Sequence, residues 1–286
     1  MRSSSLAALR HPLEPKPRRV YMLATDWMHC LGRVSFINCE PIFHDLDEKW
    51  TVLGAPPSWL TGHLLRKDCI LAPIPAADYA NHCDELVLLP ELGISSAGEV
   101  GSVLVFGDMP LKKMKTLALP SDSATSVALL KWLLKQEGLK PQTTVMGPDF
   151  ELMLEQCDGA LLIGDRALEA ARDHPEMVQI DLGKYWLENT GLPMVFGVFA
   201  ARKDTPREQL RTAHKALVDN LDIFETNPSR RSSVIATSAE QSGQSAERLE
   251  RYFGEVFNRL DQSQVDGLTH FLATALEEPV QAEFAW

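Results

Sequence analysis

Cysteine is scarce in this chain, and its spacing suggests neither a disulfide framework nor a zinc site. There are five cysteines among 286 residues, an odd number, and no two of them stand at the C-x-x-C spacing. Disulfide frameworks use even sets of cysteines, and structural zinc sites use closely spaced pairs. We therefore expect the five thiols to be buried and reduced.

Long apolar runs and positive charge are also missing. No stretch approaches the roughly 18 apolar residues of a membrane span, and the apolar run at residues 6–9 is shorter than the roughly 7–15 residues of a signal-peptide core. Lys and Arg number 28 against 39 Asp and Glu, a formal charge of −11. Because phosphate contacts need clustered basic residues, we expect a cytoplasmic protein with no nucleic-acid and no membrane partner.

The motifs of common cofactor and nucleophile sites are absent as well. The sequence contains no H-E-x-x-H, G-x-G-x-x-G, G-x-x-x-x-G-K-[ST] or G-x-S-x-G motif. The eight histidines are scattered, and none has a partner four residues away. We therefore expect no metal and no cofactor.

What the sequence does have is an alternation of short apolar runs and helical patterns, in a chain that is 45% apolar and 23% charged. Such alternation predicts an α/β fold with parallel sheets covered by helices. Strands are expected at residues 20–24, 32–36, 50–53, 69–72, 100–106, 115–119, 143–146, 160–163 and 194–200. Helices are expected at residues 41–46, 57–65, 123–137, 149–156, 165–172, 206–224, 245–260 and 263–276.

One arrangement that satisfies this order is a two-lobed clamshell. Residues 1–18 would form a flexible N-terminal arm, residues 19–107 plus 200–286 would form lobe one, and residues 108–199 would form lobe two. A two-stranded hinge would join the lobes, and the C-terminal block would consist of helices only. In such sheets, ligands bind at the carboxyl ends of strands, against helix N-termini.

Small polar residues gather where the expected strands of lobe one end. Ser35 lies near the end of the strand at 32–36 and Asn38 follows it, where Asn38 either caps the next helix or turns its amide toward a ligand. Ser95 and Ser96 open a small-residue loop that leads to Ser102. That loop either allows a ligand to approach the backbone or is a tight connection with a tolerated strand serine.

Lobe two offers two further groups at helix starts. Ser123, Ala124, Thr125 and Ser126 open a helix, and free N–H groups at a helix start attract anions. Capping explains one or two of the hydroxyls there, and an anion site explains all of them. Gly164 and Asp165 follow a buried strand, and Asp165 either caps a helix or lines the ligand site.

Five segments in order together resemble the chorismate dehydratase family, which catalyses the first step of the futalosine route to menaquinone. They lie at residues 32–41, 89–103, 123–130, 162–168 and 181–196. The resemblance implies a fold like the type II periplasmic solute-binding proteins. It also implies a carbon–oxygen lyase (hydro-lyase) reaction that removes water from chorismate to give 3-[(1-carboxyvinyl)oxy]benzoate, without cofactor or metal. The family's key asparagine falls on Asn38, its strand serine on Ser102, and its hydroxyl-rich helix start on residues 123–126.

Chorismate carries two carboxylates, so hydroxyls and helix starts are suitable anchors for it. The five segments contain no obvious histidine or glutamate base, and our hypothesis is that a carboxylate of chorismate takes the proton while Asn38 holds the reactive geometry. Glu99 is expected to point to solvent, away from the dianion. Two alternatives stay open: a non-catalytic solute-binding protein for a small carboxylate, and the later dihydroxynaphthoate-forming enzyme of the same pathway. The oligomeric state is left open.

Overall fold

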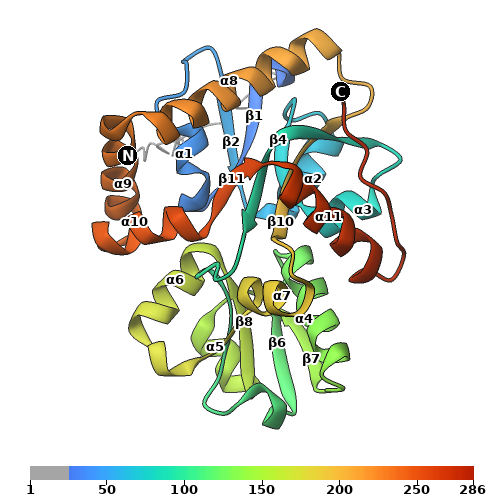
Figure 1. Ribbon diagram of the computed structural model, residues 1–286, viewed down its shortest axis with the longest axis vertical. Helices are drawn as coiled ribbons and strands as arrows, with labels where there is room; N and C mark the ends of the chain where they lie inside the picture. Colours follow the sequence, from blue (N-terminus) through green and yellow to red (C-terminus); the bar gives the residue numbers. More distant parts are fainter. Residues whose placement is uncertain (1–25) are drawn as a thin grey trace, which may run out of the picture.

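The computed structural model describes residues 26–286, which form two lobes stacked along the long axis of the molecule (Figure 1). The flexible arm expected at residues 1–18 and the strand expected at residues 20–24 lie outside the described residues. The alternation of strands and helices predicted from the sequence is confirmed across both lobes.

The first lobe is built on β1 (Cys30–Val34), β2 (Thr51–Ala55), β3 (Ala72–Pro75), β4 (Leu86–Ser96), β10 (Met194–Arg202) and β11 (Phe257–Leu260). β1 and β2 pair in parallel, and β11, β4, β10 and β3 form a four-stranded sheet in that order. β10 runs antiparallel to both β3 and β4. A bridge between Leu31 and Leu71 places β1 beside β3.

The second lobe is built on β5 (Val103–Phe106), β6 (Thr116–Pro120), β7 (Gln142–Met146), β8 (Gly159–Ile163) and β9 (Val178–Asp181), in the order β7-β6-β8-β5-β9. β6 is parallel to β7 and β8, whereas β5 is antiparallel to β8 and β9. The expectation of parallel sheets is therefore met only in part. β5 and β10 each enter their sheet directly from the other lobe, without the crossover helix that a parallel connection needs.

Two crossings join the lobes. The chain leaves β4, passes through residues 97–102 and enters β5, and it returns through residues 191–193 to β10. We expected residues 103–107 in lobe one and residues 194–199 in lobe two, but strand pairing puts these strands in the opposite lobes. We accordingly propose the two crossings as the lobe boundaries. An apolar strand does not by itself reveal which sheet it joins.

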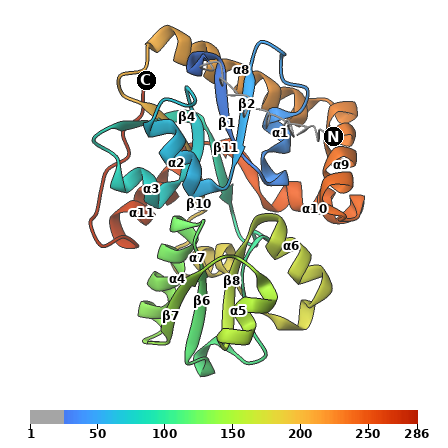
Figure 2. The ribbon, with the colours of Figure 1, turned by 180° about the vertical axis from the view of Figure 1, so that it is seen from behind.

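Helices cover the sheets of both lobes (Figure 2). Around the first lobe lie α1 (Glu40–Phe43), α2 (Pro57–Leu65), α3 (Ala76–Asn81), α8 (Arg207–Thr226), α9 (Pro228–Ser242), α10 (Ala246–Glu255) and α11 (Gln262–Thr274). Around the second lie α4 (Ala124–Gln136), α5 (Phe150–Gln156), α6 (Gly164–Asp173) and α7 (Leu182–Thr190). Short 3-10 turns are η1 (Trp27–His29), η2 (Ile37–Cys39), η3 (Leu111–Lys113) and η4 (Pro175–Met177).

The C-terminal block corrects a second expectation. It was expected to be helical throughout, with one helix at residues 245–260, but α10 ends at Glu255 and the next residues add the edge strand β11 to β4. Burial alternates with a two-residue period along β11, but the strand has only four residues. So short an alternation does not stand out after a helical pattern. α7, α9 and β9 were not predicted.

All five cysteines lie within the described residues as free thiols. Cys30, Cys39, Cys69 and Cys157 are buried, as expected, whereas Cys83 is half-buried. Within residues 26–286, no helix is long and apolar enough to cross a membrane.

Candidate functional site

A narrow cavity of about 60 Å³ lies where the two lobes meet, and residues of both lobes line it. Most of its wall is apolar, with Phe36, Ile94 and Phe196 among the contributing side chains. The polar lining groups are Asn38, Ser102, Ser123 and Ser126. A mostly apolar pocket with a few convergent polar groups is the usual form of a small-molecule site. The sequence had predicted all four of these polar residues.

Asn38 lies in η2 and is 7% exposed. Its Oδ1 is buried and has no hydrogen-bond partner among the described residues. The helix-cap interpretation of Asn38 is wrong, because the cap positions of η2 and α1 are held by Phe36 and Cys39. A buried, unpartnered amide oxygen costs about 1–3 kcal/mol, and this one belongs to a residue of the cavity wall.

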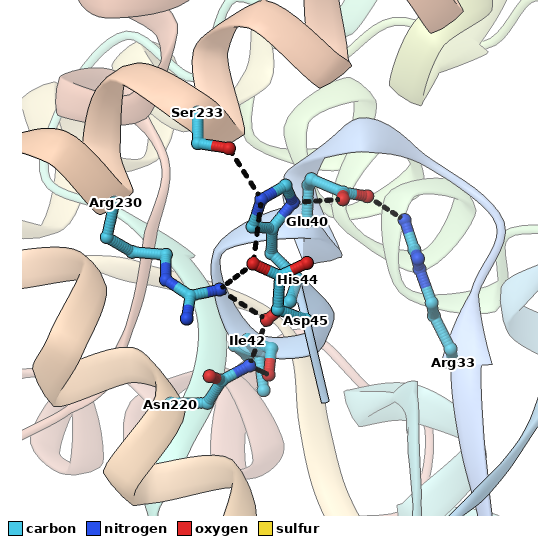
Figure 3. Close-up of polar contacts among 8 residues, drawn as sticks. All are labelled: Arg33, Glu40, Ile42, His44, Asp45, Asn220, Arg230 and Ser233. Carbon is cyan, nitrogen blue, oxygen red and sulfur yellow. Dashed lines mark hydrogen bonds and ion pairs between the residues drawn. The ribbon is translucent and has the colours of Figure 1, made fainter. Parts of the chain in front are cut away.

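A buried ionic network fixes α1, the short helix that follows Asn38 (Figure 3). The Glu40 carboxylate, with a side chain 5% exposed, accepts from Arg33 Nη2 at 2.5 Å and lies 3.0 Å from His44 Nδ1. His44 Nε2 in turn lies 2.9 Å from Ser233 Oγ. The network thus ties α1 to β1 on one side and to α9 on the other.

The C-terminal helices also hold the backbone at the end of α1 (Figure 3). Asn220 Nδ2 on α8 donates to the carbonyls of Ile42 and His44 at 2.7 and 2.8 Å. Arg230 Nη1 on α9 donates to the same His44 carbonyl at 3.0 Å. Because β1, α8 and α9 all hold α1, the preceding turn is a rigid support for the Asn38 side chain.

Ser102 ends the first crossing and lines the cavity. Its Oγ accepts from the hydroxyl of Tyr252 at 3.0 Å and donates to the Val100 carbonyl at 3.3 Å. Burial raises the pKa of Tyr252 well above its ordinary value, so the phenol stays a hydrogen-bond donor. Of the two interpretations left open for Ser102, its place in the cavity wall favours the binding one.

Ser123 and Ser126 stand at the start of α4. Ser123 occupies the N-cap position but makes no side-chain cap bond; its Oγ lies 2.8 Å from Ser126 Oγ, and both residues line the cavity. Thr125 faces elsewhere, and its Oγ1 accepts from the backbone N–H of Ala77 in the first lobe at 3.1 Å. Capping therefore does not account for these hydroxyls.

Gly164 and Asp165 begin α6. Gly164 lines the cavity with φ of +61°, and a Cβ there would lie 2.5 Å from the Phe36 ring. Asp165 is not a helix cap, because Ile163 holds that position. Its carboxylate instead accepts from the backbone N–H of Ile37 at 3.1 and 3.3 Å, and burial raises its pKa from 3.8 to about 6.

Six residues expected at the site do not line the cavity, and Thr125 and Asp165 are two of them. Ser35 is exposed and Ala124 is half-buried beside the lining. Ser95 and Ser96 are fully buried, because β4 extends through both where a loop was expected. Ser96 Oγ donates to the Gly98 carbonyl at 3.2 Å, which stabilises the crossing rather than a ligand.

The sequence did not single out the ion pair beside the cavity. Arg166 pairs with Asp122, and its guanidinium stacks on the lining residue Phe36 with 5.3 Å to the ring centre. Arg166 Nε and Asp122 Oδ1 are both buried without a partner among the described residues. The two residues are 44 positions apart in the chain, so only the fold reveals this pair.

Glu99 points to solvent, as expected. Its side chain is 61% exposed and pairs with Lys184 Nζ at 3.0 Å. Residues 26–286 hold no cluster of three or more His, Cys, Asp or Glu side chains arranged for a metal ion.

Comparison with known proteins places the chain among biosynthetic relatives. Residues 30–277 match a family described as menaquinone biosynthesis. The chain is 34% identical to a chorismate dehydratase from Thermus thermophilus over 273 residues, which cover 90% of this chain and 98% of that protein. It is 25% identical to a 1,4-dihydroxy-6-naphtoate synthase from the same organism over 74% of this chain and 72% of the relative.

Solved structures share the fold at low sequence identity. A protein from Archaeoglobus fulgidus superposes with a TM-score of 0.70 at 18% identity, over 84% of this chain and 93% of that one. The alkanesulfonate-binding protein of Xanthomonas axonopodis pv. citri superposes with a TM-score of 0.66 at 14% identity, over 88% and 95%. These neighbours confirm the predicted two-lobed α/β fold like that of the periplasmic binding proteins.

Proposed function

The chain belongs to the menaquinone biosynthesis family, and from that membership we propose that it is a hydro-lyase that removes water from chorismate to give 3-[(1-carboxyvinyl)oxy]benzoate. The observation that carries the proposal is Asn38, whose buried Oδ1 has no partner among the described residues and which lines the cavity between the lobes. The relationship to a chorismate dehydratase along nearly the whole of that protein supports the choice of substrate.

The reaction breaks one C–H bond and one C–O bond at neighbouring carbons of the chorismate ring, and it makes the ring aromatic. A proton leaves one ring carbon, the hydroxyl leaves the neighbouring carbon, and the electron pair of the C–H bond becomes the last double bond of the benzene ring. The proton and the hydroxide together make one water. Because aromatisation drives the reaction, the protein needs mainly to hold the substrate and to assist proton removal.

The cavity offers separate surfaces for the ring and for the carboxylates. The apolar wall, which includes Phe36 and Phe196, suits the planar ring. Ser123 and Ser126 offer hydroxyls at the start of a 13-residue helix. Free N–H groups and the dipole at such a helix start favour an anion, and we assign one substrate carboxylate to this end of the cavity.

We assign proton removal to the substrate itself. Among the described residues, those that line the cavity include no histidine, aspartate or glutamate. A carboxylate of chorismate is then the base closest to the ring proton, and Asn38 holds the substrate in the geometry that this transfer requires. Positioning of this kind can contribute several kcal/mol to catalysis.

Incubation of the purified protein with chorismate tests the proposal. Mass spectrometry should show a product lighter by one water, and proton NMR should show a new aromatic ring. A solute-binding protein would bind chorismate without converting it, and a dihydroxynaphthoate-forming enzyme would leave it unchanged. Either result would exclude the proposed reaction. A cytoplasmic location and a reaction without cofactor stay predictions.

A further inference from the structure

One hydrogen bond crosses between the lobes next to Asn38. The Asp165 carboxylate at the start of α6 accepts from the backbone N–H of Ile37, with Oδ1 at 3.1 Å and Oδ2 at 3.3 Å. Ile37 opens η2 and directly precedes Asn38. Asp165 is therefore a second-lobe group that contacts the η2 turn, and this turn carries the proposed catalytic side chain of Asn38.

The contact places the Asp165 carboxylate in a largely buried position, where its charged form is unfavourable. Desolvation is the largest influence on Asp165, and it outweighs the Ile37 N–H and the nearby Arg166 and Arg33. The phenol of Tyr252 and the thiol of Cys39 also lie near enough to feel its charge. A buried carboxylate that is held by one amide and by two cations at a distance contributes little to stability, so its presence calls for another role.

We propose that Asp165 is a positioning residue, which holds the η2 turn through the Ile37 N–H so that Asn38 keeps its reactive place when the lobes are closed. This inference rests on the proposed function, since it assigns Asn38 to turnover. Asp165 does not line the cavity. It acts through the backbone of its neighbour.

Three other hydrogen bonds join the lobes, and they allow positioning to be told apart from simple closure. Thr125 Oγ1 accepts from the Ala77 N–H at 3.1 Å, and the Asp122 carbonyl accepts from the Ser58 N–H at 3.4 Å. A third runs from Arg172 Nη1 on α6 to the Gly243 carbonyl after α9 at 3.3 Å. None of the three lies on the η2 turn. Thr125→Val therefore removes an inter-lobe bond of the same kind while leaving the Ile37 contact intact.

The first measurement needs no substrate. Amide hydrogen exchange at Ile37, followed by NMR, should be at least about 10-fold faster in Asp165→Ala than in the wild type, because the N–H loses its acceptor. Asp165→Asn keeps an acceptor oxygen and should retain most of the protection. Thr125→Val should leave Ile37 protected and expose Ala77 instead.

The second measurement is turnover of chorismate. Asp165→Ala should lower kcat by about 10- to 100-fold, since a misplaced catalytic group loses rate steeply, whereas KM should change little because the cavity wall is intact. Asp165→Asn should restore kcat to within about threefold of wild type. Asp149→Ala, which removes an exposed carboxylate that caps α5, is the matched control and should turn over normally.

Normal kcat in Asp165→Ala, or unchanged Ile37 exchange in that variant, would overturn the positioning role. Equal loss of kcat in Asp165→Asn and Asp165→Ala would also overturn it, because the charge and not the accepted N–H would then matter. Failure of the wild type to convert chorismate is a separate outcome, and it would remove the proposed function together with this inference.

Discussion

The hydroxyl of Tyr252 on α10 donates to Oγ of Ser102 at 3.0 Å, so a C-terminal helix of the first lobe orients a cavity hydroxyl on the crossing between the lobes. Tyr252 is fully buried and Ser102 is 3% exposed. A hydroxyl that both accepts and donates has a fixed direction, and Ser102 also donates to the Val100 carbonyl. The orientation of Ser102 toward the cavity therefore depends on Tyr252.

Tyr252→Phe should lower both stability and activity. Loss of one buried hydrogen bond is expected to reduce the free energy of unfolding by about 1 kcal/mol, measured in urea. The Ser102 hydroxyl, freed to rotate, should bind substrate less well and raise KM. Tyr79→Phe is the matched control, because the Tyr79 hydroxyl accepts from the Glu283 N–H at 2.9 Å. It should lose similar stability with normal KM; an equal KM change in both would refute the role of Ser102.

Asn38→Ala should separate activity from stability. Turnover of chorismate is expected to fall by at least about 100-fold, as when an enzyme loses one preorganised polar group of its active site. The free energy of unfolding should stay level or rise by about 1 kcal/mol, because a buried, unpartnered Oδ1 is removed. Asn38→Asp should also be inactive, since it adds a buried charge facing a dianion. Near-normal turnover in both variants would contradict the assignment of Asn38.

Gly164→Ala should disturb the cavity wall. Both Gly164 and Gly138 have positive φ, of +61° and +67°, so alanine costs about 1 kcal/mol of backbone strain at either position. A Cβ at Gly164 also meets the Phe36 ring, whereas one at Gly138 meets nothing within 4 Å. We expect the Gly164 variant alone to raise KM; equal kinetics in the two variants would show that Phe36 does not shape the site.

Stability should depend on pH through Asp165. Its folded-state pKa of about 6 lies above its ordinary value of 3.8, so its contribution to folding is present below pH 4 and is lost as pH rises through about 6. Relative to Asp165→Asn, the wild type should therefore lose on the order of 3 kcal/mol between pH 4 and 7, measured by urea unfolding at each pH.

Asp158 supplies a control of opposite sign. The backbone N–H groups of Lys115 and Thr116 hold the pKa of Asp158 below its ordinary value. The wild type should accordingly lose stability relative to Asp158→Asn as pH falls. The same direction in both comparisons would contradict the assigned cause.

The polar residues of the cavity could be predicted because they follow strands or open helices, a local pattern that parallel neighbours bring to one edge. Asn38, Ser123 and Ser126 were found in this way, whereas Ser102 precedes the antiparallel strand β5 and was singled out at the end of the small-residue loop. Whether Asn38 caps a helix could not be decided from the sequence, because capping depends on the backbone angles of Phe36 and Cys39.

Contacts between distant residues left no local signal. Asp165 and Ile37 are 128 positions apart, and Arg166 meets Asp122 across 44. Strand direction was hidden for a related reason, since β5 and β10 are apolar on both faces and such strands do not reveal their partners. The two-lobed arrangement could be predicted from the sequence, but the lobe to which β5 and β10 each belong could not.

Three of the inter-lobe hydrogen bonds share one direction, and they bear on the timing of the catalytic cycle. Each uses an N–H at the start of a first-lobe helix or turn, those of Ile37, Ser58 and Ala77, and each ends on a second-lobe oxygen. Closure therefore has an affinity of its own, about 0.5–1.5 kcal/mol for each bond, and a bound molecule need not supply all of it. Opening of the lobes must break these three bonds and the one from Arg172 to the Gly243 carbonyl, so a product release that requires opening has a barrier separate from that of the chemical step.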